Sequence, residues 1–200
     1  MNKIGCVFLI LTVLAFAGTG CQNKTTSVTK ARVEFKNTVE GNFFFIPEGS
    51  TAGYTKIDPD SLGNYAYEVE LKEPGYFRYV GVNNNFYLVY LTPGARVEIQ
   101  EGTDGVGFAG DHAAENMFLS KNVYLGAVPE DIPLYSAEWV SLNSEKVNRL
   151  IKNLETSGLN PDFIRLQTLK YHCDFYLQRL NGPTNTAMFA PQLKIELADD

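Results

Sequence analysis

The stretch YFRYVGVNNNFYLVYLTPGARVEIQ, residues 76–100, decides the fold. It contains three runs rich in β-branched and aromatic residues, separated by the turn-forming residues 83–85 and 92–95. This pattern predicts a meander of three antiparallel strands. Pro93 fixes φ at the second position of a turn and Gly94 accepts a positive φ at the third, which predicts a type II turn.

The middle strand of this stretch is apolar on both faces. One face carries Phe86, Leu88 and Tyr90, and the other carries Tyr87, Val89 and Leu91. A strand that is apolar on both sides must be covered on both sides, because each face has to be buried against another element. One cover is a facing sheet, and a packed helix could supply the other.

The residues before this stretch also predict short strands, near 32–35, 43–46, 54–57 and 65–71, and one more follows near 106–108. About eight short strands at spacings near ten residues are typical of a sandwich or barrel. Residues 31–110 are therefore expected to form an antiparallel β-sandwich or a partly open barrel.

After Asp111 the apolar residues change to helical spacing. Asp111 is the expected N-cap of a first helix, and a second helix is expected to end near Gly158. Asn160 followed by Pro161 predicts the start of a third helix, which Pro183 is expected to stop. The predicted fold is thus α+β, with the β-domain at 31–110 followed by a three-helix subdomain at 111–200.

The first twenty residues resemble a bacterial lipoprotein signal peptide. Lys3 precedes an uncharged apolar stretch of 14 residues at 4–17, which is too short to span a bilayer, and small residues precede Cys21. The resemblance implies that Cys21 is lipidated and becomes the amino terminus. Ala15 and Ala17 form a competing site for ordinary secretory cleavage. Residues 21–30 are polar and predict a tether between the anchor and the folded domain.

Composition and cysteine count restrict the function classes. Apolar residues make up 44% of the 200 residues and charged residues 20%, as in soluble globular domains. The formal net charge of -6 and the lack of a basic block argue against nucleic acid as a partner. If Cys6 leaves with the leader and Cys21 is lipidated, Cys173 has no disulfide partner. Its place on the apolar side of the third helix predicts a small buried hydrophobe.

Residues 86–99, 106–110 and 114–119 together resemble the N-terminal β-sandwich domain, of unknown function, of Bacteroides-type envelope lipoproteins with a thioredoxin-like or peroxiredoxin-like C-terminal domain. The resemblance covers roughly residues 31–180, including a helical linker. It implies a lipid-anchored, periplasm-facing protein of the cell envelope that acts as a spacer, docking or dimerisation module of a thiol-disulfide oxidoreductase system.

The resemblance supplies no catalytic residue. Family activity belongs to a Cys-x-x-Cys or peroxidatic cysteine on the thioredoxin-like domain, which has no counterpart in this chain. Either the chain is part of a longer oxidoreductase, or it is a stand-alone relative without redox chemistry. By itself it is expected to be non-catalytic.

Two weaker motifs favour structural roles. Residues 105–110 match the spacing G-x-G-x-x-G, but Val106 and Phe108 alternate as in a strand, whereas a dinucleotide loop joins a buried strand to a helix. The two histidines, His112 and His172, have no metal-ligand spacing. We therefore predict no cofactor and no metal.

Tyrosines give the alternative function. Aromatic faces on a β-sandwich can stack on sugars, so a glycan- or peptide-binding lipoprotein is the competing hypothesis, and core packing of the same rings is the structural alternative. The candidate ligand-binding residues are Tyr76, Tyr79, Tyr87 and Tyr90. The predicted partners are the membrane, through Cys21, and a protein partner or a second copy, while the small-molecule ligand is unknown.

Overall fold

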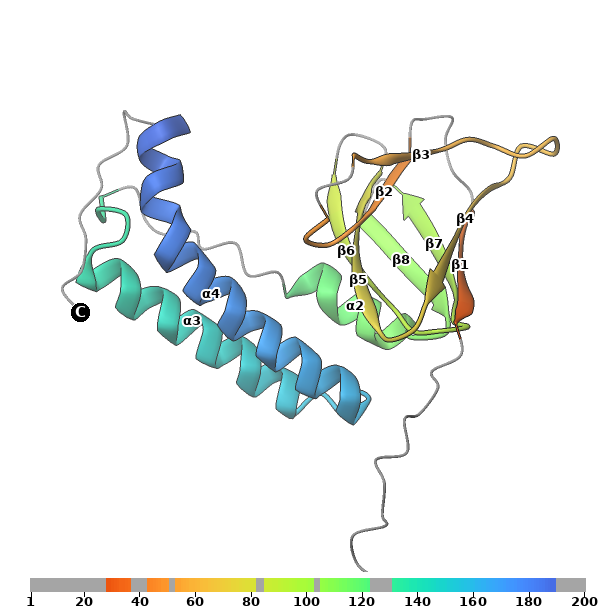
Figure 1. Cartoon of the computed structure of the whole chain (residues 1–200). Helices are drawn as coiled ribbons and strands as arrows, with labels where there is room; N and C mark the ends of the chain where they lie inside the picture. The colour runs from red at the N-terminus through yellow and green to blue at the C-terminus, as the bar shows by residue number, and fades with distance from the viewer. Residues whose placement is uncertain are drawn as a thin grey trace, which may run out of the picture.

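A computed structural model describes residues 28–36, 43–50, 53–81, 85–102, 105–122 and 131–189. Eight strands in two sheets are followed by three helices, so the predicted α+β order is confirmed (Figure 1). The two four-stranded sheets are separate and do not close into a barrel, which decides between the two predicted architectures. The predicted leader and the Cys21 anchor lie outside the described residues.

Sheet one has the strand order β4-β1-β7-β8. Its strands are β1 (Thr29–Lys36), β4 (Tyr65–Leu71), β7 (Arg96–Gly102) and β8 (Gly105–Gly110). Strand β1 pairs antiparallel with β4 and parallel with β7, so the sheet is mixed. The G-x-G-x-x-G motif is the whole of β8, paired with β7, and not a turn between a strand and a helix.

Sheet two has the order β3-β2-β5-β6, and all of its pairs are antiparallel. Its strands are β2 (Phe43–Pro47), β3 (Thr55–Ile57), β5 (Gly75–Val80) and β6 (Phe86–Leu91). Strands β5 and β6 are the first two strands of the predicted meander. Strand β6 is the outer strand of this sheet.

The predicted third strand of the meander was wrong, because β7 crosses to sheet one. The turn between β6 and β7 is as predicted: Gly94 has φ 81°, and the Ala95 N–H donates to the Thr92 carbonyl over 3.1 Å. Strand β7 buries Val97 and Ile99 but exposes the residues between them. Such a strand suits sheet one, whose outer face meets solvent, whereas helices cover the outer face of β6.

Two cores share strand β6, so the prediction that both of its faces are covered is confirmed. The sandwich core lies between the sheets and comprises Ala31, Val33, Phe35, Phe43, Phe45, Ile57, Phe77, Tyr79, Val89, Leu91, Val97 and Ile99. The helical core lies on the other face of β6 and comprises Tyr90, Leu119, Tyr135, Trp139, Val147, Leu150, Leu154, Phe163, Tyr171 and Phe175.

Helix α2 (Ala113–Lys121) packs against β6 and β8, while α3 (Ala137–Glu155) and α4 (Pro161–Phe189) form a hairpin beside the sandwich (Figure 1). The predicted start of the third helix is confirmed, because the Asn160 side-chain oxygen accepts the N–H of Asp162 over 2.9 Å. No helix among the described residues is both long and apolar enough to cross a membrane.

The predicted N-cap of the first helix was wrong. His112 occupies that position with φ 57° and makes no side-chain cap bond. Asp111 instead accepts the N–H of Arg96 at its Oδ2 over 2.8 Å, and its own N–H donates to the Arg96 carbonyl. The carboxylate therefore joins the chain to the start of β7 and is not available to cap the helix.

Helix α4 does not stop at Gly182 and Pro183, as the sequence predicted, but continues through both. Pro183 has no backbone N–H, so the helix lacks one hydrogen bond there, and packing must offset the lost stabilisation. A Cβ at Gly182 would clash with the ring of Tyr135, so glycine allows Tyr135 to pack closely on the helix. The Tyr135 hydroxyl also lies 3.1 Å from the Thr186 hydroxyl, one turn further along α4.

Candidate functional site

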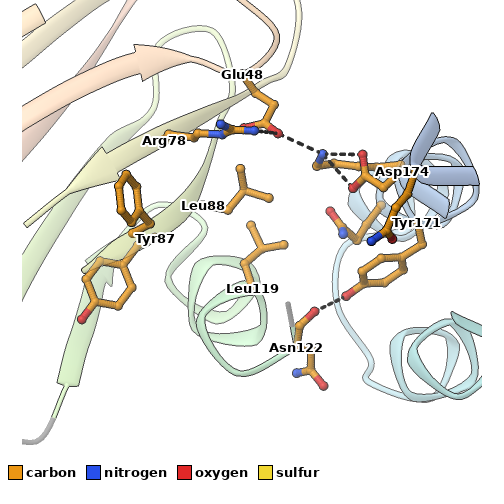
Figure 2. A pocket seen from close by; sticks show the side chains of 12 residues that line it. Glu48, Arg78, Tyr87, Leu88, Leu119, Asn122, Tyr171 and Asp174 are labelled. Atoms are coloured by element: carbon orange, nitrogen blue, oxygen red, sulfur yellow. Dashed lines mark hydrogen bonds and ion pairs between the residues drawn. The ribbon is translucent and has the colours of Figure 1, made fainter. Parts of the chain in front are cut away.

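A cleft of about 400 Å³ lies between the sandwich and helix α4 (Figure 2). Its walls come from the turn after β2, from β5 and β6, from the end of α2 and from one face of α4. The lining residues are Glu48, Arg78, Phe86, Tyr87, Leu88, Leu119, Asn122, Gln167, Lys170, Tyr171, Asp174 and Gln178. This volume falls within the range of about 300–1,000 Å³ that is typical of small-ligand pockets.

A row of ion pairs closes one side of the cleft. Arg78 Nε lies 2.7 Å from Glu48 Oε2, and Lys170 Nζ lies 3.4 Å from Glu48 Oε1. The same ammonium lies 3.0 Å from Asp174 Oδ2, one turn along α4. Figure 2 shows this row crossing from the sandwich to α4, above Leu88 and Leu119. The ion pairs therefore connect the two parts of the fold.

The charges of the cleft balance. Burial raises the pKa of Glu48, but the hydrogen bonds from Arg78 and the positive charge of Lys170 outweigh it, so the pKa of this carboxyl lies below its usual range. Two cationic and two anionic side chains line the cleft, and they pair with one another. The cleft therefore offers no net charge to attract an anion or a metal ion. Within the described residues no cluster of three or more potential metal ligands occurs.

The opposite side of the cleft is polar and buried. Tyr171 donates its hydroxyl to the Asn122 carbonyl over 2.7 Å, which joins α4 to the end of α2. Burial raises the pKa of Tyr171 to about 12, although a hydrogen bond with Gln167 lowers it in part. Gln167 is only 2% exposed, and its Oε1 has no hydrogen-bond partner among the described residues. A buried acceptor of this kind favours a ligand that carries an N–H or O–H donor.

The four candidate tyrosines lie on opposite faces of sheet two. Tyr79 and Tyr87 face the sandwich core with ring centroids 5.9 Å apart, and the Tyr79 hydroxyl donates to Glu101. Tyr76 and Tyr90 face the helices with centroids 5.5 Å apart. Tyr79 is 0% exposed and Tyr90 is 2% exposed. The structure thus brings the rings together as two pairs and not as one exposed platform, and Tyr87 alone lines the cleft.

A second surface of interest is the outer face of α4, defined here by Leu169, Cys173, Tyr176, Leu177 and Leu180. The four large apolar side chains in this set are 54–74% exposed. Cys173 is also exposed, so its predicted burial was wrong. The helix carries apolar residues on more than one face, and its buried face is occupied by Phe163, Tyr171 and Phe175.

The sequence contained a signal for this second face. Phe163, Gln167, Tyr171 and Phe175 recur every four residues and form the buried face. The exposed residues recur at 169, 173, 177 and 180, which is also helical spacing but is rotated away from the first set. Separating the two stripes would have shown that Cys173 does not share a face with Tyr171.

Comparison with known proteins gives no relative: no family model, no curated protein and no solved structure matches this chain. The cleft and the outer face of α4 are therefore interpreted from their own geometry and chemistry.

Proposed function

We propose that this protein is an exported, lipid-anchored docking module of the cell envelope that holds a protein partner on the outer face of α4 and catalyses no reaction itself. The observation that supports this most directly is the exposed apolar stripe from Leu169 to Leu180. Contiguous exposed apolar side chains are typical of protein interaction sites. The leader that precedes Cys21 supports export and anchoring.

The charged side chains beside this stripe indicate what kind of partner surface would fit it. Arg165 and Arg179 lie along one side of the outer face, where Arg165 also pairs with the exposed Asp162 over 3.8 Å. The two guanidinium groups suit a partner whose apolar surface is bordered by acidic side chains. The resemblance of the sequence favours a thioredoxin-like domain as the partner.

Cys173 is a natural reporter of whether the outer face is covered. We expect a maleimide to alkylate Cys173 rapidly in the purified full-length protein, and slowly in intact envelopes where the partner is bound. Leu177→Asp should restore rapid alkylation in envelopes, because a charge in the stripe disrupts apolar docking. Mass spectrometry of the peptide that contains Cys173 gives the extent of labelling.

A matched control separates docking from poor access of the reagent. Cys173→Ser combined with Ser141→Cys moves the thiol to an exposed position on α3, and this thiol should label equally in both preparations. Equal labelling of Cys173 in envelopes and in purified protein would contradict the proposal. Protection that rises with the concentration of the purified protein alone would instead indicate a second copy as the occupant.

The anchor has a separate test. Cys21→Ser should move the protein from the membrane fraction to the soluble fraction, and mass spectrometry should find acyl chains on the amino-terminal residue of the unsubstituted protein. An unmodified amino terminus after Ala17 would support ordinary secretion, and would contradict lipidation without affecting the docking test.

A second candidate function is ligand binding in the cleft. The four tyrosines are divided between two faces of sheet two, which does not favour a glycan platform. One observation favours an extended peptide over a glycan: among the described residues, no strand pairs with the outer edge of β6 where it borders the cleft.

A further inference from the structure

Strand β6 presents backbone groups at the outer edge of sheet two. At one end of this edge a side chain pairs with them: the Tyr90 N–H donates to Asn116 Oδ1 over 2.7 Å, and the Tyr90 carbonyl accepts from Asn116 Nδ2 over 3.1 Å. Asn116 is fully buried. Its amide makes the same two hydrogen bonds that a residue of a further strand would make, so it acts as a one-residue substitute for that strand.

Within the described residues, no side chain takes this role at the next positions along the edge. Tyr90 lies opposite Tyr76, whose carbonyl accepts the Glu48 N–H over 2.8 Å on the far side of β5. Tyr76 and Tyr90 therefore form a non-hydrogen-bonded pair, in which the N–H and carbonyl groups of each residue point away from the other residue. Because the pattern repeats every two residues, Leu88 and Phe86 also direct their N–H and carbonyl groups outward. No strand lies beyond β6 in the described part of the chain.

This open edge faces the cleft. Phe86 and Leu88 line it on one side, and Gln167 and Lys170 of α4 line it on the other. The Phe86 ring is 64% exposed, an unusual environment for an aromatic side chain in a strand. Gln167 supplies an independent indication, because it lines the same cleft and its buried Oε1 has no hydrogen-bond partner among the described residues. Open backbone groups and an unpartnered acceptor both call for a ligand with amide donors and acceptors.

We propose that the cleft binds an extended peptide segment, which adds to sheet two as a strand beside Phe86 and Leu88. A segment of three residues would form about four backbone hydrogen bonds, two with each of these residues. The Asn116 amide ends the site at Tyr90.

The chemistry of the walls defines the peptide further. A side chain that points into the cleft meets Leu88 and Leu119, which favours an apolar residue at that position. An amide N–H of the bound segment would satisfy Gln167 Oε1, and the Phe86 ring would cover the segment from solvent. The balanced charges of Glu48, Arg78, Lys170 and Asp174 suit a neutral backbone and do not select a phosphate or a free carboxylate.

The ligand sequence is unidentified, so the first probe is a displayed library of random heptapeptides selected on the immobilised full-length protein. The best enriched peptide is resynthesised and then N-methylated at one residue at a time. Each N-methyl group on a residue that pairs with β6 should weaken binding by about tenfold, because it removes a backbone donor and blocks the edge. N-methylation of the residues between them should have little effect.

Hydrogen exchange locates the bound peptide. The amides of Leu88 and Phe86 should become protected when the peptide is added, while the amides of β8, at the edge of the other sheet, should not change. The proposal is overturned if no peptide is enriched, if every N-methylated peptide binds as well as the parent, or if protection appears only on the outer face of α4.

Two substitutions test the protein side. Leu88→Pro removes the outward N–H from an edge strand, where proline is tolerated, and should abolish binding. Gln167→Met keeps the length of the side chain and removes the unpartnered oxygen together with the hydrogen bond to Tyr171. It should weaken peptide binding, and urea unfolding of the same variant measures the separate cost to stability. Leu177→Asp, on the outer face of α4, should leave peptide affinity unchanged. Because this variant changes the proposed docking face and not the cleft, its result shows whether the peptide site stands or fails independently of the docking function.

Discussion

Gly110 and Gly63 have nearly the same backbone conformation in different surroundings. Their φ values are 78° and 80°, but a Cβ on Gly110 would lie 2.5 Å from the Arg96 carbonyl oxygen, while a Cβ on Gly63 would meet no atom within 4 Å. We expect Gly63→Ala to cost about 1–2 kcal/mol of unfolding free energy, from the left-handed backbone alone. Gly110→Ala should cost roughly 3 kcal/mol or more, because backbone atoms must also move. Urea unfolding measures both, and equal losses would contradict a steric role for Gly110.

Tyr171 should make stability depend on pH in the alkaline range. Its pKa is raised by burial to about 12, compared with about 10 for an exposed tyrosine. The unfolded chain therefore ionises first, so this stabilisation is complete below about pH 10 and is lost as the pH rises through the folded pKa.

Tyr171→Phe should reduce the fall in unfolding free energy between about pH 10 and 12. At neutral pH it should cost about 1 kcal/mol, from the lost hydrogen bond to the Asn122 carbonyl. The comparison requires denaturant unfolding at several pH values. A variant with the same alkaline slope as the unsubstituted protein would show that Tyr171 does not contribute.

At the scale of the element, Asn116 holds helix α2 against β6. Asn116→Ala would leave the buried N–H and carbonyl of Tyr90 without partners, so we expect a loss of about 2–4 kcal/mol. Ser136→Ala is the matched control: Ser136 is also buried, but its hydroxyl accepts only one helix N–H among the described residues, that of Trp139. This control should lose roughly 1 kcal/mol. Similar losses in thermal or urea unfolding would argue that Asn116 has no special role at the edge.

The sequence predicted the positions of the strands better than it predicted which strands pair with each other. Alternation and continuous apolar runs, each ended by turn-forming residues, located all eight strands. It did not reveal that β7 leaves the meander and pairs with β1 from 64 residues earlier, since pairing depends on which face of each sheet is covered. Gly182 and Pro183 gave the wrong end for α4, because a local stop signal was overcome by the contact with Tyr135.

The candidate sites differ in how far the sequence could predict them. The four tyrosines were identifiable as candidate ligand-binding aromatics, but their division between two faces of sheet two depends on strand register. The cleft could not be predicted, because it joins Glu48, Arg78, Asn122 and Lys170 from distant parts of the chain. Only the outer face of α4 had a local signal, in the second apolar stripe.

At the scale of the whole molecule, Tyr90 connects the sandwich to the helices. It belongs to β6, lies in the helical core, and packs edge-on against Phe163 with ring centroids 5.0 Å apart. We expect the unsubstituted protein to unfold in one transition. Tyr90→Ala should cost about 3–5 kcal/mol and separate the helices from the sandwich.

Trp139, buried in the helical core, provides the measurement. In Tyr90→Ala its fluorescence should change at a lower urea concentration than the circular dichroism signal of the strands. Leu62→Ala, at an exposed position in a turn, should leave the two transitions coincident. Coincident transitions in Tyr90→Ala would show that the ion pairs of the cleft suffice to couple the two parts.

The position of β1 has a mechanical consequence. This strand lies inside sheet one, with β4 on one side and β7 on the other. Tension applied to the chain just before Thr29 acts along the strand and loads both neighbouring ladders in shear. The two ladders must then rupture together, whereas an edge strand could peel away from a single neighbour. A folded domain that is anchored through its amino-terminal end, as proposed for this protein, would therefore resist unfolding when it is pulled from that end.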